Sequence, residues 1–159
     1  MSKEFHGFKE NPAQLIETMF KAIAEHSIND FPLINQNVSV YATKFQLFEG
    51  QWVGNILTPW MLSTLILPGP DQIWPSRTLG ERLGLAFPQG NMTFMVGETE
   101  QLGQYLSSSL MSPINKGLSQ EQAVQLADDS LRILLSLPIT DVDNPKDPGR
   151  RALFSIKRP

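Results

Sequence analysis

Histidine, the commonest catalytic base, is scarce in this chain, cysteine is absent, and no serine or carboxylate stands in a catalytic motif. The only histidines are His6 and His26, both near the N-terminus. His26 falls late on an expected helix, where partial exposure beside the negative end of the helix dipole accounts for it. No G-x-S-x-G sequence presents a serine nucleophile. The absence of cysteine excludes a disulfide, a thiolate metal site and a redox dithiol.

Carboxylate pairs and glycine-rich loops give no better case for chemistry. Asp128 and Asp129 are adjacent on an expected helix, so their side chains point about 100° apart and fit a solvated face. Two further carboxylate pairs fall at a turn or near the C-terminus: Glu98 with Glu100, and Asp141 with Asp143. In "PGPDQ" the prolines remove the backbone N–H groups that bind phosphate. We therefore expect no enzyme activity, no metal and no cofactor.

One stretch, residues 45–76, has a composition that favours binding of a partner. It holds all three tryptophans and several prolines but no lysine or arginine, and its only charged residues are Glu49 and Asp71. The candidate partner-binding residues in this stretch are Glu49, Trp52, Thr58, Pro59, Trp60, Met61, Pro68, Gly69, Pro70, Asp71 and Trp74.

The tryptophans of this stretch are not equivalent candidates. Trp52 alternates with Val53 in a strand-like run, so we expect it in the core. Trp60 and Trp74 each adjoin a proline and rank ahead of it for a binding surface. Pro59 inside an apolar run indicates an edge, a bulge or the first residue of a new strand. An edge strand beside aromatic side chains is a natural place for an extended peptide to pair.

Secondary-structure patterns around these residues predict an α+β fold, a single domain (1–159) with an antiparallel sheet flanked by an N-terminal and a C-terminal helix. Asn11 is an expected N-cap of a first helix over about 12–28. Ser119 and Gln122 have capping-box spacing for a last helix that ends near Ser136. The expected strands are 38–48, 51–58, 60–67, 92–99 and 102–111, with turns at 49–50 and 98–102, and a short helix is expected near 78–83, ending at Gly84.

Composition limits the classes of protein. A length of 159 residues, 41% apolar content and 18% charged content are typical of one globular domain. The net charge of −3 does not suit a nucleic-acid-binding surface. No apolar run is long enough to span a membrane, and no secretory signal is recognisable, so we expect no membrane insertion and a cytoplasmic location.

Residues 138–159 form a proline-rich, basic tail that we expect to be loosely packed, with "ALFSI" at 152–156 as a possible returning strand. Its basic residues are Lys146, Arg150, Arg151, Lys157 and Arg158. Such a tail either increases solubility or docks on an acidic partner, and both interpretations stay open.

Several long runs resemble one known family. "LFEGQWVGNILTPWMLSTLILPGPDQIWP", "GNMTFMVGE", "YLSSSLMSP" and "GRRALF" closely resemble the HybE family of nickel–iron hydrogenase assembly chaperones, and the similarity covers nearly the whole chain. The resemblance implies an accessory protein that binds the hydrogenase small-subunit precursor, which carries a twin-arginine export signal, and delays its export. The large subunit is a second candidate partner; the oligomeric state is left open.

The distribution of charge along the sequence supports this interpretation independently of the family resemblance. Between positions 83 and 131, Lys116 is the one lysine or arginine, against a set of carboxylates: Glu98, Glu100, Glu121, Asp128 and Asp129. Arginines of a signal peptide can bind such carboxylates through two hydrogen bonds. Under this hypothesis Trp60, Met61 and Trp74 contribute most of the affinity, while Glu49 and Asp71 set the register. A small-ligand carrier or a structural interaction subunit remains the alternative.

Overall fold

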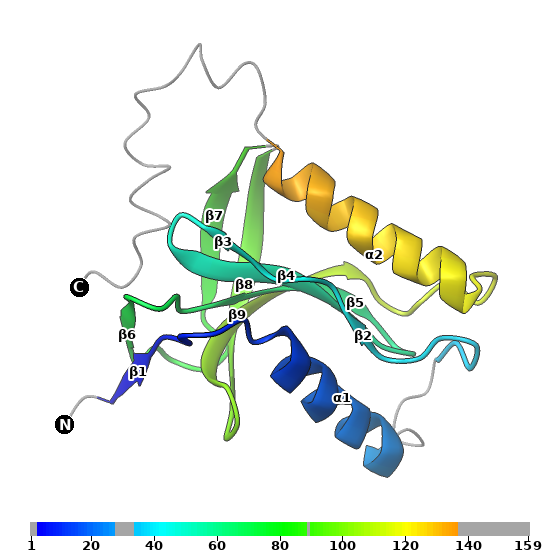
Figure 1. Ribbon diagram of the computed structural model, residues 1–159, viewed down its shortest axis with the longest axis horizontal. Helices are drawn as coiled ribbons and strands as arrows, with labels where there is room; N and C mark the ends of the chain where they lie inside the picture. Colours follow the sequence, from blue (N-terminus) through cyan, green and yellow to red (C-terminus); the bar gives the residue numbers. More distant parts are fainter. Residues whose placement is uncertain (1–2, 28–33, 89, 137–159) are drawn as a thin grey trace.

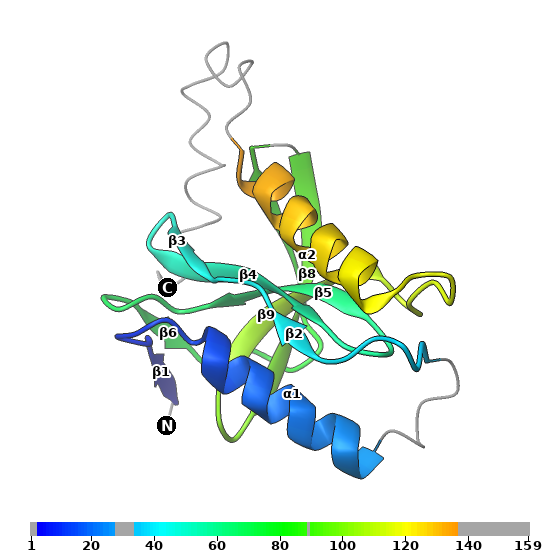
Figure 2. The same ribbon diagram turned by 45° about the vertical axis from the view of Figure 1, so that its right-hand side comes forward.

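The computed structural model of the chain describes residues 3–27, 34–88 and 90–136. An antiparallel sheet lies between two helices, with α1 (Ala13–Ser27) on one face and α2 (Gln120–Leu135) on the other, as Figures 1 and 2 show. The predicted α+β architecture is confirmed. The predictions for the tail, 138–159, lie outside the described residues.

In the described part of the chain, seven strands form the main sheet in the order β2-β4-β5-β9-β8-β7, with β3 also paired to β4. Their bounds are β2 Tyr41–Ala42, β3 Gln46–Phe48, β4 Gln51–Leu57, β5 Leu62–Leu67, β7 Arg82–Phe87, β8 Gly90–Thr99 and β9 Gly103–Met111. A separate ribbon pairs β1 (Glu4–His6) with β6 (Ile73–Pro75). The predicted hairpin of 92–99 and 102–111 is confirmed as β8 and β9.

Strands β4 and β5 are buried along their whole length because both faces of the sheet are covered. Successive side chains of a strand point to opposite faces. Trp52 and Ile56 therefore join the apolar cluster that contains α1 residues such as Ile16, whereas Val53 joins the cluster that contains Leu131 of α2. This two-sided burial explains why the segment is almost continuously apolar.

Both helices begin where the sequence predicts. Asn11 Oδ1 accepts a hydrogen bond from the Ala13 N–H at 3.0 Å, which caps α1. At α2, Ser119 and Gln122 form the predicted capping box, and the helix ends at Leu135. Below α2, the buried Asn55 donates from Nδ2 to the Ala127 carbonyl at 3.0 Å, which ties the helix to the centre of the sheet.

Two expectations about secondary structure are wrong. The helix expected near 78–83 does not form. Residues Arg82–Phe87 are strand β7, in which Leu83, Leu85 and Phe87 pack against the core and alternate with the more exposed Arg82, Gly84 and Ala86. The single strand expected over 38–48 is interrupted. Its two pieces, β2 and β3, both pair with β4, and the buried Phe45 lies between them.

Candidate functional site

The structure divides the predicted partner-binding residues between the two ends of the β4–β5 hairpin. Thr58, Pro59, Trp60 and Met61 connect the two strands at one end. The other candidates lie at the opposite end, where β4 begins and β5 has ended: Glu49, Trp52, Pro68, Gly69, Pro70, Asp71 and Trp74. A strand rises about 3.3 Å per residue, so the length of β4 separates the two groups by roughly 20 Å. They do not form one surface.

At the turn end, Thr58 organises a tight connection rather than a strand edge. Its Oγ1 accepts hydrogen bonds from the N–H groups of Trp60 and Met61, at 3.3 and 3.0 Å. Pro59 is buried in this turn, and β5 beyond it is paired on both sides, so the expectation of an edge strand here is wrong. Trp60 and Met61 are only partly buried and pack against the cluster that includes α1.

The other two tryptophans are part of the interior. Trp52 is 8% exposed, which confirms its expected place in the core. Trp74 is 2% exposed, so the expectation that it lines a surface is wrong. Each indole N–H is satisfied inside the protein: Trp52 Nε1 donates to the Phe8 carbonyl at 2.9 Å, and Trp74 Nε1 donates to Gln72 Oε1 at 3.2 Å. These internal partners allow both rings to be buried without leaving an unpaired N–H group.

Beside these rings three backbone segments meet at glycines, an arrangement called here the backbone crossing (Gly7, Gly50 and Gly69). A Cβ added to Gly7 would lie 1.5 Å from the Gly69 carbonyl oxygen. One added to Gly69 would lie 1.7 Å from the Gly50 carbonyl oxygen. Atoms cannot approach so closely, so only glycine lets the N-terminal segment, the β5–β6 connection and the β3–β4 turn pack together.

The prolines of "PGP" fit the same arrangement. The Pro68 carbonyl accepts from the Phe8 N–H at 3.1 Å, and the Pro70 carbonyl accepts from Lys9 Nζ at 2.9 Å. Between them, the Gly69 N–H donates to Gln72 Oε1 at 3.0 Å. The β5–β6 connection therefore accepts hydrogen bonds from the N-terminal segment through its carbonyl groups. The backbone N–H groups that its prolines lack are not needed there. The concentration of tryptophan, proline and glycine in 45–76 thus has a structural explanation.

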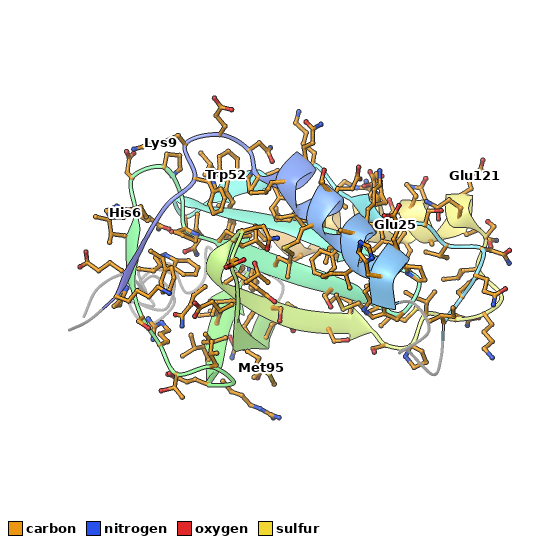
Figure 3. All side chains as sticks on the ribbon, turned by 90° about the horizontal axis from the view of Figure 1, so that it is seen from below. His6, Lys9, Glu25, Trp52, Met95 and Glu121 are labelled. Atoms are coloured by element: carbon orange, nitrogen blue, oxygen red, sulfur yellow. The ribbon has the colours of Figure 1, made fainter. Side chains whose placement is uncertain are left out.

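Two clefts border the β1–β6 ribbon at this end. The smaller, about 240 Å³, is lined by His6, Gly7, Lys9, Pro70, Asp71, Gln72 and Ile73 and is called the Asp71 cleft. It includes two of the predicted binding residues, Pro70 and Asp71. Figure 3 shows His6 and Lys9 together at this end of the molecule, with Glu121 toward the opposite end.

The larger cleft, about 560 Å³, is lined by Lys3, Phe5, Leu79, Glu98, Thr99, Glu100 and Gly103 and is called the Glu98 cleft. Lys3 Nζ lies 3.2 Å from Glu98 Oε2 and 5.2 Å from the centre of the Phe5 ring. Leu79, at 60% exposed, is the most exposed large apolar side chain of the described residues. Carboxylates, an aromatic face and an exposed leucine make this cleft suitable for a cationic, partly apolar ligand.

Sequence reasoning missed most of the Glu98 cleft. Glu98 and Glu100 were noted as a carboxylate pair at a turn and as part of the carboxylate-rich stretch 83–131, but Lys3, Phe5 and Leu79 were not candidates at all. Lys3 and Glu98 are 95 positions apart, and pairing of β1 with β6 brings the N-terminal segment to this end. No local pattern signals such a contact. The one indication in the sequence was the excess of carboxylates over lysine and arginine in residues 83–131, which includes Glu98 and Glu100.

The clefts share what we call the acidic end of the molecule, defined by five exposed carboxylates: Glu4, Glu49, Asp71, Glu98 and Glu100. Lys3 and Lys9 lie among them, and Arg77 lies at the same end through its backbone bonds to Gln104, so five carboxylates stand against three cations. Within residues 3–27, 34–88 and 90–136, no group of histidine and acidic side chains is placed to hold a metal ion. In the same ranges, no helix is long and apolar enough to cross a membrane.

Comparison with known proteins assigns the family. Residues 11–156 match the family model described as "[NiFe]-hydrogenase assembly, chaperone, HybE". The chain belongs to the HybE family. It is 47% identical to the hydrogenase-2 operon protein HybE of Escherichia coli strain K12, over 99% of this chain and 97% of that protein. It is 30% identical to the hydrogenase expression/formation protein HoxT of Azotobacter vinelandii, over 89% and 92% of the two chains.

A solved structure agrees with the fold described above. The solution structure of HybE from Escherichia coli is similar to this one with a TM-score of 0.73 and 47% identity, covering 90% of this chain and 88% of that one. The resemblance noted in the sequence is therefore confirmed, and with it the family's role as hydrogenase assembly chaperones.

Proposed function

We propose that this protein binds the precursor of a hydrogenase small subunit through its twin-arginine signal and delays its export until assembly is complete. On this proposal it acts in the cytoplasm, without catalysis or a cofactor. The large subunit is a further partner that we propose on the same grounds. Membership of a family of hydrogenase assembly chaperones supports the general role; the choice of the signal as ligand rests on the protein's own surface.

The observation that carries this proposal is the acidic end. A twin-arginine signal is a basic segment followed by apolar residues, so its receptor needs exposed carboxylates close to apolar surface. Glu98 and Glu100 meet this requirement beside Leu79, and Asp71 meets it beside Ile73, which is 43% exposed. Clusters of carboxylates also increase the association rate of a cationic peptide.

The structure changes which residues we propose for this role. Glu49, Pro70 and Asp71 remain candidates because they lie at the acidic end. Trp52 and Trp74 are withdrawn as contacts because they are buried. Trp60 and Met61, about 20 Å away at the hairpin turn, would serve at most a second contact with a folded subunit.

Titration of a fluorescently labelled signal peptide tests the proposal. The peptide should bind, and binding should weaken as salt rises from 50 to about 300 mM because the contacts involve exposed charges. A control peptide with both arginines replaced by glutamine should bind at least about tenfold more weakly. Equal binding of the two peptides, or no binding of either, would contradict the proposal.

A further inference from the structure

Lys3 already occupies the position in the Glu98 cleft that an external cation would take. Its ammonium group contacts both the Glu98 carboxylate, at 3.2 Å, and the face of the Phe5 ring, at 5.2 Å. A carboxylate and an aromatic face are the two groups that together bind a guanidinium group best. The cleft is thus formed around a cation supplied by the chain itself.

Interior contacts hold the two groups that receive this cation. Gln104 is 3% exposed, and its Nε2 donates to Glu98 Oε1 at 3.3 Å. The same amide donates to the Arg77 carbonyl at 2.7 Å, which fixes its orientation. Phe5 is 8% exposed and lies over Gly103, where an added Cβ would come 2.7 Å from the ring. The carboxylate and the ring are therefore in place before any ligand arrives.

The occupying lysine, in contrast, is easily displaced. The Lys3 side chain is 64% exposed, so the lysine end of the ion pair is open to solvent, whereas the Glu98 side chain is 28% exposed. An exposed lysine gains little stability from such a pair, and water can replace its contact at little cost. A ligand that can bind Glu98 and Phe5 more strongly than a lysine can replace it.

We propose that one arginine of the twin-arginine signal displaces Lys3 from Glu98 and Phe5, while apolar residues of the signal contact Leu79. This inference rests on the proposed function and specifies its binding site. A guanidinium group stacks flat on a ring and binds a carboxylate through two hydrogen bonds, which an ammonium group cannot do. Adjacent residues of an extended chain point to opposite sides, so the second arginine lies outside the cleft.

The neighbouring Asp71 cleft is less suited to this ligand. Its lysine, Lys9, bonds the Pro70 carbonyl at 2.9 Å, and no phenylalanine, tyrosine or tryptophan lines it. At about 240 Å³ it is also less than half as large as the Glu98 cleft. Lys21 and Glu17 of α1 provide the matched control: their ion pair has the same residue types and similar side-chain exposures, 58% and 28%, but neither residue lines a cleft at the acidic end.

The test compares the affinity of the full-length protein for the labelled signal peptide in four variants. Lys3→Gln removes the internal competitor and should tighten binding about two- to fivefold. Glu98→Gln removes the receiving carboxylate and should weaken binding about tenfold or more. Lys21→Gln and Glu17→Gln make the same changes in net charge and should change affinity less than about twofold, because both residues lie on α1, outside the clefts.

Opposite effects of Lys3→Gln and Glu98→Gln, each beyond its charge-matched control, are the expected result. If wild-type protein binds the peptide but each cleft variant changes affinity no more than its control, the cleft assignment is overturned while the proposed function stands. If wild-type protein does not bind the peptide, the proposed function itself fails. Should Glu98→Gln unfold in a thermal melt, Lys3→Gln decides alone, since Lys3 is too exposed to affect folding.

Discussion

The backbone crossing and the Glu98 cleft lie at the same end of the sheet but use their residues in opposite ways. In the crossing, Gly7 and Gly69 leave no free space, and the indole N–H of Trp74 is bonded inside the protein. In the cleft, the Lys3 side chain is exposed to solvent and its contact with Glu98 can be exchanged. Rare residue types thus mark where the chain packs on itself, whereas common charged residues form the surface available to a partner.

The largest effect is expected from filling the crossing. In Gly69→Ala the new methyl group would meet the Gly50 carbonyl 1.7 Å away, and backbone cannot move as a flexible side chain can. We expect a loss of at least about 3 kcal/mol in the free energy of unfolding, or failure to fold. Urea denaturation followed by tryptophan fluorescence measures it.

Gly84→Ala is the matched control for that experiment. Gly84 lies in β7, and a Cβ there would have no atom within 4 Å. Its free energy of unfolding should change by less than about 1 kcal/mol, or rise, because alanine has less freedom than glycine to lose. Similar stability of Gly69→Ala and Gly84→Ala would show that the crossing is not tightly packed.

A smaller effect separates the two kinds of tryptophan. Trp74→Phe removes the hydrogen bond to Gln72 and part of a side chain that is 2% exposed, so the free energy of unfolding should fall by about 1–3 kcal/mol. Trp60→Phe, at a partly exposed position, should cost less than about 1 kcal/mol. Thermal or urea unfolding of both variants tests the ranking; a larger loss for Trp60→Phe would reverse the roles assigned here.

The smallest predicted effect is a gain at the β3–β4 turn. Glu49 has a φ of 54° and Gly50 a φ of 86°, as both central residues of a type I′ turn require. Asparagine adopts this backbone conformation more readily than glutamate. Glu49→Asn should therefore raise the free energy of unfolding by about 0.5–1 kcal/mol, measured by urea denaturation. A loss of stability would indicate that the glutamate side chain contributes more than its backbone conformation costs.

Local patterns were sufficient to predict much of the fold. The capping residues Asn11 and Ser119 and the turn at 49–50 are encoded within a few positions, and each is found as expected. The helix expected near 78–83 is wrong and strand β7 was not predicted, because its apolar residues Leu83, Leu85 and Phe87 are few and Gly84 interrupts them. Period-two burial became visible only once pairing with β8 was known.

The candidate site could be predicted only in part. Aromatic and proline content in 45–76 correctly singled out an important segment, but composition alone does not distinguish a buried ring from an exposed one. Trp74 is buried because β1 pairs with β6 and covers it, a contact between residues about 70 positions apart. The same pairing brings Lys3 to Glu98. Contacts between residues distant in the sequence therefore explain both why Trp74 was wrongly expected at the surface and why Lys3 was not a candidate.

Amide chemical shifts of labelled protein, recorded as the signal peptide is added, test most directly where the partner binds. We predict the largest changes at Lys3–Phe5 and at Glu98–Gly103, with little change at the hairpin turn that contains Trp60 and Met61. Changes concentrated at Trp60, Met61 and the neighbouring face of α1, with none around Glu98, would contradict the account.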